Sequence, residues 1–122
     1  MARTFLNVIL LGVLLASCSL TSASDSVEIR VANRSTSRFD RVIVGFSDGQ
    51  QEYGALGPGA TSEYRTIAEA YRYAYFEVRL DTTRLVIQPI DFVGETPLGG
   101  GRYTYALSLT RDRNLAFELE RD

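Results

Sequence analysis

From Ser26 onward, apolar residues recur at every second position in several segments of this 122-residue chain. Val27, Ile29 and Val31 show the pattern first, with polar or small residues between them. Successive side chains of a strand point to opposite faces, so this alternation is typical of strands with one buried face, whereas a helix repeats every 3.6 residues. The sequence therefore predicts an all-β domain.

We expect about seven strands, at positions 27–32, 42–46, 61–67, 71–80, 85–92, 103–110 and 115–120. Turn-forming residues separate these segments, and the pair joined at 111–114 has the clearest hairpin pattern. Pro89 indicates an edge strand or a bulge, because proline cannot donate a ladder hydrogen bond. Short strands at this spacing predict a single antiparallel β-sandwich, immunoglobulin-like or transthyretin-like, with a small barrel as the alternative.

The N-terminus has the three parts of a secretory signal. A basic residue lies in the first four positions, an apolar run extends from Phe5 to Ala16, and small residues follow. The run is shorter than the about 20 apolar residues that span a bilayer, so a permanent transmembrane helix is the less favoured interpretation. We expect residues 1–17 to form an N-terminal signal helix that is removed as a signal peptide.

The signal ends in Leu15-Ala16-Ser17-Cys18, which resembles the lipobox of bacterial lipoproteins. The resemblance implies that Cys18 is alkylated by a diacylglyceryl group, that a dedicated peptidase cuts before it, and that the new amino group is usually acylated, which gives two or three acyl chains. Two or more acyl chains give stable membrane anchoring. The alternative is a secreted soluble β-domain cleaved after position 23 or 24, in which case Cys18 is discarded.

Residues 18–26 follow as the lipidated cysteine and a Ser/Thr-rich tether. At no more than ~3.5 Å per residue the tether reaches only about 30 Å, so the domain of residues 27–122 should lie close to the bilayer. The residue after the cysteine is Ser19 rather than Asp. The lipoprotein resemblance then implies an outer-membrane location, facing the periplasm or the cell surface.

Composition excludes several functions. The net charge is only −2, which argues against a nucleic-acid partner. The chain has no histidine and one cysteine, so we expect no Ser-His-Asp or Cys-His catalytic set, no zinc or other metal site and no cofactor. A carboxylate pair is the remaining catalytic option, but the candidate acids have no diagnostic spacing and are better explained as turn and loop residues: Asp40, Asp48, Asp81 and Asp91.

Tyrosine is the one residue type with functional content. Tyr71, Tyr73 and Tyr75 recur at period two, and with Arg79 they would share the outward face of one strand. Tyrosine suits binding surfaces because it offers a large contact area and a polar tip at low entropic cost. The alternative is ordinary cross-strand aromatic pairing on a sheet.

The stretch from Val27 to Val78 resembles small bacterial export domains of the immunoglobulin-like kind. The resemblance lies in a Val-x-Asn-x-Ser strand end that contains Asn33 and in a Gly-x-x-Ser/Thr-x-Tyr step that ends at Tyr64. We expect a non-catalytic, membrane-anchored envelope lipoprotein that acts as an interaction or structural module. The alternative is a surface protein that binds a ligand or glycan through the Tyr/Arg face.

Overall fold

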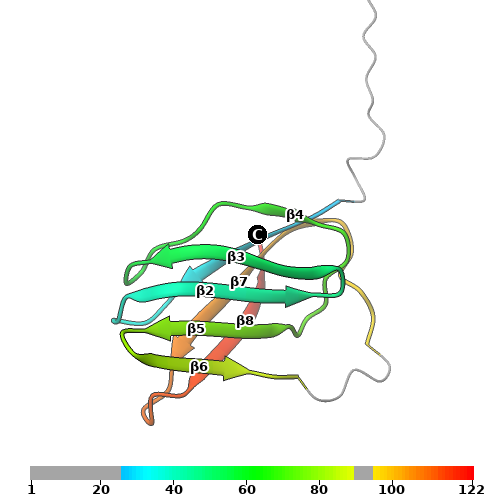
Figure 1. Ribbon diagram of the computed structural model, residues 1–122. Helices are drawn as coiled ribbons and strands as arrows, with labels where there is room; N and C mark the ends of the chain where they lie inside the picture. The colour runs from blue at the N-terminus through cyan, green and yellow to red at the C-terminus, as the bar shows by residue number, and fades with distance from the viewer. Residues whose placement is uncertain (1–25, 90–94) are drawn as a thin grey trace, which may run out of the picture.

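The computed structural model describes residues 26–89 and 95–122. These residues form eight strands and no helix, arranged as two four-stranded sheets packed face to face (Figure 1). None of them forms a helix long and apolar enough to cross a membrane. The expected signal helix, Cys18 and all of the tether before Ser26 lie outside the described residues, as does Asp91.

The first sheet, here called the β1 sheet, has the order β4-β1-β7-β8. Its strands are β4 Arg65–Ile67, β1 Val27–Asn33, β7 Gly101–Leu109 and β8 Leu115–Arg121. The β7–β8 hairpin confirms the pair expected around 111–114. In its turn, the amide of Thr110 donates to the carbonyl of Asn114 and the amide of Arg113 donates to the carbonyl of Thr110.

The second sheet, the β2 sheet, has the order β3-β2-β5-β6. Its strands are β3 Gly49–Leu56, β2 Phe39–Phe46, β5 Tyr75–Leu80 and β6 Thr83–Ile87. All neighbours in this sheet are antiparallel. The strand β6 is an edge strand, and it ends two residues before Pro89, in keeping with the edge position that this proline indicated.

The expectation of a wholly antiparallel sandwich is wrong for one pair, because β1 and β7 run parallel over seven residues from Val27↔Gly101 to Asn33↔Leu107. Side chains alternate with the same period in parallel and antiparallel strands, so the pattern carries no information on direction. Direction is set by a tight turn when two strands are consecutive, and β1 and β7 are far apart in the chain.

Several predicted strand boundaries are also wrong. The strand β3 was not expected, because Gly49 and Gly54 and the intervening polar residues hide its alternation, and only Tyr53 and Leu56 in it are buried. The segment 71–74 precedes β5 instead of belonging to it. The third expected strand is reduced to β4, and Thr61 forms an isolated bridge with Ala32.

The core lies between the two sheets and confirms the inward set of the alternation. Val31, Val44, Phe76 and Tyr105 are fully buried within it, together with the other inward residues of β1, β2, β5 and β7. Burying such a side chain contributes about 1.5–3 kcal/mol relative to leaving it in water. Aromatic contact links the sheets, since the rings of Phe76 and Tyr105 meet edge to face at 5.0 Å.

Candidate functional site

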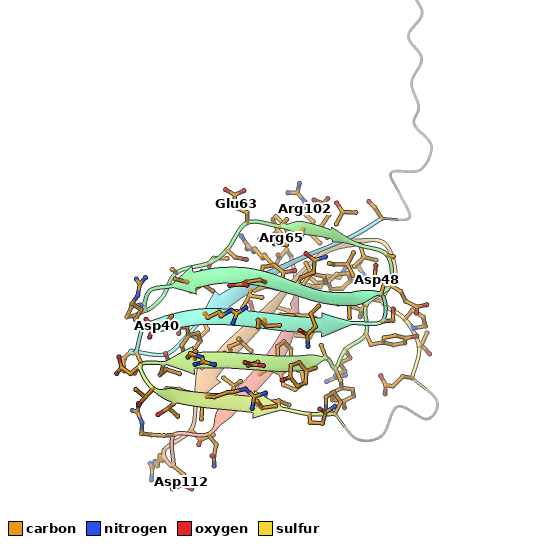
Figure 2. All side chains as sticks on the ribbon, viewed as in Figure 1. Asp40, Asp48, Glu63, Arg65, Arg102 and Asp112 are labelled. Atoms are coloured by element: carbon orange, nitrogen blue, oxygen red, sulfur yellow. The ribbon has the colours of Figure 1, made fainter. Side chains whose placement is uncertain are left out.

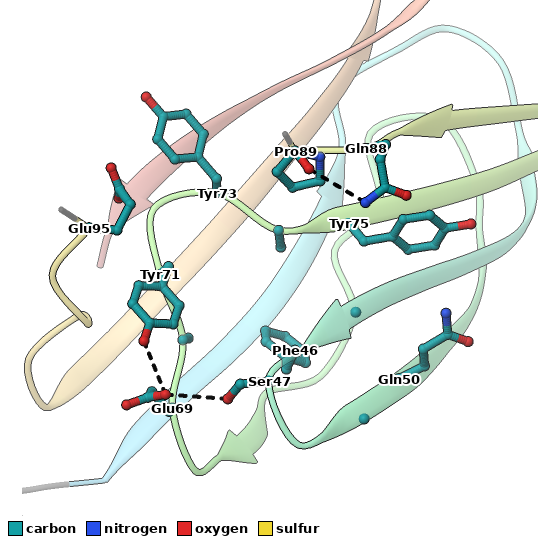
Figure 3. Close-up of a pocket in the computed structure, with 14 residues that line it drawn as sticks. Phe46, Ser47, Gln50, Glu69, Tyr71, Tyr73, Tyr75, Gln88, Pro89 and Glu95 are labelled. Carbon is teal, nitrogen blue, oxygen red and sulfur yellow. Dashed lines mark hydrogen bonds between the residues drawn. The ribbon is translucent and has the colours of Figure 1, made fainter. Parts of the chain in front are cut away.

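A cavity of about 490 Å³ opens at one end of the β2 sheet (Figure 3). Its walls come from the end of β2, the start of β3, the segment 69–75, the residues after β6, and Glu95. We call it the tyrosine pocket, because Tyr71, Tyr73 and Tyr75 all line it. Its volume lies in the usual range for small-molecule sites, about 300–1,000 Å³.

Small residues around the tyrosines explain why three large rings gather here. Ala70 and Ala74 are buried at 1% and 4% exposure, while the residues between them face the pocket or solvent. Tyr75 begins β5 opposite Gly45 of β2. A Cβ atom at Gly45 would lie 3.0 Å from the Cβ of Tyr75, so glycine leaves the space that Tyr75 occupies.

Hydrogen bonds hold the segment before β5 in place at both the backbone and the side chain of Tyr71. The hydroxyl of Tyr105, a core residue, donates to the carbonyl oxygen of Tyr71. The hydroxyl of Tyr71 donates to Glu69 Oε1 at 3.1 Å, and this hydrogen bond raises the pKa of Tyr71. Ser47 donates to the same oxygen at 3.4 Å, which joins the segment to the β2–β3 turn (Figure 3).

Tyr75 is held by a charged network on the outer face of the β2 sheet. Its hydroxyl donates to Glu77 Oε1 at 2.8 Å, and Arg84 forms an ion pair with Glu77 at 3.0 Å. Hydrogen bonds from Arg84 and Tyr75 lower the pKa of Glu77, and the bond to Glu77 raises the pKa of Tyr75. The network fixes the direction of the Tyr75 ring along the sheet.

Tyr73 is the most open of the three aromatic walls. Its side chain is 40% exposed, and its ring meets Phe117 of β8 edge to face at 5.9 Å. Tyr73 therefore links the rim of the tyrosine pocket to the other sheet while leaving part of its ring for a ligand.

The structure brings together three of the four residues predicted for the binding face. Arg79 lies elsewhere, on the outer face of the β2 sheet, opposite Arg41 and Arg84 and outside the pocket. The strand begins at Tyr75, so the period-two face that would join Arg79 to Tyr71 does not exist. The tyrosines meet around a cavity instead of along a flat stripe.

Sequence reasoning missed the polar residues of the site. Glu69, Gln50 and Glu95 line the tyrosine pocket but lie in turns and loops or at a strand start, where no periodicity predicts the direction of a side chain. The one signal of the site in the sequence was Gly45, a glycine inside a predicted strand. The structure places it opposite Tyr75.

The candidate catalytic acids that the structure describes lie at turns and strand ends. Asp40 Oδ2 accepts a 2.7 Å hydrogen bond from the amide of Asp81, which ties β2 to the β5–β6 turn, and Arg38 is 3.4 Å from Asp40. Asp48 lies in the turn at the opposite end of β2 (Figure 2). Asp40 and Asp48 are therefore not a pair that could act on one substrate.

The outer face of the β1 sheet carries a second cluster of polar side chains. The Tyr64 ring lies between the guanidinium groups of Arg30 and Arg102, 4.8 and 4.6 Å from its centroid, and its hydroxyl donates to Asp122. Burial alone would raise the pKa of Asp122, but hydrogen bonds from Tyr64 and Thr104 lower it. The charges and hydrogen-bonding groups of this cluster are paired with one another, so we interpret the cluster as a structural contact between strands.

No protein-family model matches the chain, and no curated protein matches its sequence. The fold is similar to the NMR structure of a protein from Eubacterium rectale, with a TM-score of 0.59 and 12% sequence identity. The match covers 85% of this chain and 97% of that chain. At this identity the similarity concerns the fold alone.

Proposed function

We propose that this chain is a non-catalytic lipoprotein of the cell envelope, anchored through Cys18, whose β-sandwich is an interaction module. One observation carries the proposal: the tyrosine pocket lies at the end of the sandwich where the chain enters the domain. A tether of the length in this sequence would hold that end toward the membrane. The binding site and the anchor would then act at the same surface.

The relation between chain entry and pocket rests on strand register. β1 begins at Val27, which pairs with Ile67 at the end of β4 and with Gly101 at the start of β7. Ala70, which lines the pocket, lies three residues beyond Ile67, and its carbonyl accepts a 2.8 Å hydrogen bond from the amide of Leu98. The β2–β3 turn and the start of β5 lie at this same end (Figure 1).

Strand order favours one of the two predicted sandwich types. In the immunoglobulin arrangement the first two strands share a sheet. Here β1 and β2 belong to different sheets. We therefore infer the transthyretin-like alternative. The two motifs that resemble immunoglobulin-like export domains, one containing Asn33 and the other ending at Tyr64, lie at strand ends and turns, and such features occur in both sandwich types.

The convergence of three tyrosines favours a second, more specific function, a surface protein that binds a small ligand or glycan. The pocket supplies a concave surface with four aromatic rings among its walls, which suits such binding. Arg79 is not required for it. Ser19 after the lipidated cysteine supports an outer-membrane location for either function.

Site-specific photo-cross-linking in cells tests the interaction module. A photoreactive phenylalanine analogue would replace Tyr73 in one strain and Val86 in another. The two positions are matched in exposure, 40% and 38%, but Val86 lies on the edge strand β6 outside the pocket. We expect a discrete envelope adduct from position 73 and none of that mass from position 86.

The same adduct from both positions, or none from either, would contradict the proposal. Membrane fractionation of both strains controls for correct export.

A further inference from the structure

We propose that the tyrosine pocket binds an organic cation, an alkylammonium group carried on an apolar body. The inference rests on the proposed binding function and names its ligand class. It is carried by the two carboxylates and the aromatic rings that line the pocket, with no basic residue of the described segments among them.

Arginines neutralise part of the negative charge in the described part of the chain. This part forms six ion pairs, each between an arginine and a carboxylate. None of them includes Glu69 or Glu95, the two acids that line the tyrosine pocket. No basic residue of the described segments lines the pocket, although the chain has thirteen arginines.

The two acids have acceptor capacity left for a ligand. Both hydrogen bonds to Glu69, from Tyr71 and Ser47, go to Oε1, so Oε2 accepts none within the described residues. Glu95 is half-buried and accepts no hydrogen bond from a residue that the structure describes. Two half-buried carboxylates that form no ion pair with a described residue favour a ligand that brings positive charge.

The aromatic walls determine which cation fits. The faces of Tyr and Phe rings attract a cation within about 6 Å, and quaternary ammonium ligands are recognised by such rings. Phe46, Tyr71, Tyr73 and Tyr75 line the same cavity as the two acids. A hard metal ion would instead need about six to eight oxygen ligands. The volume of about 490 Å³ accommodates an apolar body beside the charge.

The first experiment compares choline with 3,3-dimethylbutan-1-ol, its neutral isostere in which carbon replaces nitrogen. The full chain, purified from membranes in a polyoxyethylene detergent, would be titrated with each and followed by amide NMR shifts. We expect choline to bind about tenfold more tightly than the isostere, with shifts centred on positions 69–75. Equal binding of the two probes would overturn the inference.

Variants locate the effect in the pocket. Glu69→Gln combined with Glu95→Gln should weaken choline binding about tenfold, and Tyr73→Leu, which keeps an apolar side chain, should weaken it several-fold. Glu52→Gln is the matched control, because Glu52 is ion-paired with Arg41 on the outer face of the same sheet. It should leave binding unchanged. If the double variant does not fold, the exposed Tyr73→Leu position carries the test.

The cation could be a free amine or a lipid head group, and reconstitution distinguishes them. Choline would be titrated into the chain in vesicles of equal phosphatidylglycerol content, and therefore equal surface charge, with and without phosphatidylethanolamine. Weaker choline binding with phosphatidylethanolamine identifies a lipid head group as the occupant, whereas equal binding identifies a free amine. Both results support the cation site.

The failures of the two proposals differ. If a neutral probe such as tri-N-acetylchitotriose binds the pocket and choline does not, the cation inference is wrong while the ligand-binding function stands. If neither binds and position 73 cross-links nothing, the proposed function is wrong as well.

Discussion

At the scale of single residues, Asn33 has the most demanding position in the domain. It is fully buried at the end of β1, and its side-chain nitrogen lies within 3.1 Å of the carbonyl oxygens of Ser37, Leu56 and Gly57. Its side-chain oxygen accepts from the amide and hydroxyl of Ser35. One amide therefore ties β1 to the loop after it and to the end of β3.

We expect Asn33→Ala to lower the free energy of unfolding by about 3 kcal/mol, because buried carbonyl groups lose their donor. Asn33→Asp should cost a similar amount, since it keeps the acceptor but removes the donor. Urea unfolding of the purified chain measures both. Asn33 lies at the opposite end of β1 from the pocket, so choline binding to the folded variants should not change.

A loss below about 1 kcal/mol for either substitution would show that water or other groups replace the donor.

Asn33 and the tyrosines show how much of the structure could be predicted from single positions of the sequence. The Val-x-Asn-x-Ser motif was visible as a pattern, and its physical reason is the hydrogen-bonding role of Asn33. Alternation predicts that Tyr105 is buried and that Tyr73 is exposed, but not that Tyr73 lines a pocket. Tyr105 is buried with its hydroxyl on the carbonyl of Tyr71, whereas Tyr73 is the most exposed large aromatic among the described residues.

At the scale of elements, the tyrosine pocket depends on the contact between β2 and β5. Tyr75 occupies the space above Gly45, its cross-strand neighbour. Any side chain at position 45 would displace the aromatic wall and disturb the pairing of the two strands.

Gly45→Ala should therefore lower the free energy of unfolding by about 1–2 kcal/mol through overpacking and weaken choline binding several-fold. Gly57→Ala is the matched control, because no atom lies within 4 Å of an added Cβ there. Urea unfolding and the NMR titration measure the two effects. Unchanged binding in Gly45→Ala would show that Tyr75 does not shape the site.

Elements with strong alternation or a clear turn were predictable, including β1, β7, β8 and the hairpin between the last two. The strand β3 was not, because its pairing with β2 stabilises a polar, glycine-containing segment that has little pattern of its own. The tyrosine segment before β5 was misassigned for the opposite reason. Its alternation is real, but the chain there lines a cavity instead of joining a sheet.

At the scale of the whole molecule, sequence predicted an all-β domain and not its strand order. The parallel β1–β7 pair and the assembly of the pocket from five separate segments both depend on long-range packing, which no local pattern encodes. In our proposal, this packing has a functional consequence. It places the ligand site at the end of the sandwich that a short tether would hold near the membrane.

The intact mass of the protein recovered from bacterial membranes, measured beside a Cys18→Ala version, tests the anchored lipoprotein most directly. We predict a mass that corresponds to cleavage before Cys18 plus two or three acyl chains, and its absence in the variant. A soluble, unmodified protein cleaved after position 23 or 24 would contradict the account and leave a secreted β-domain with a free pocket.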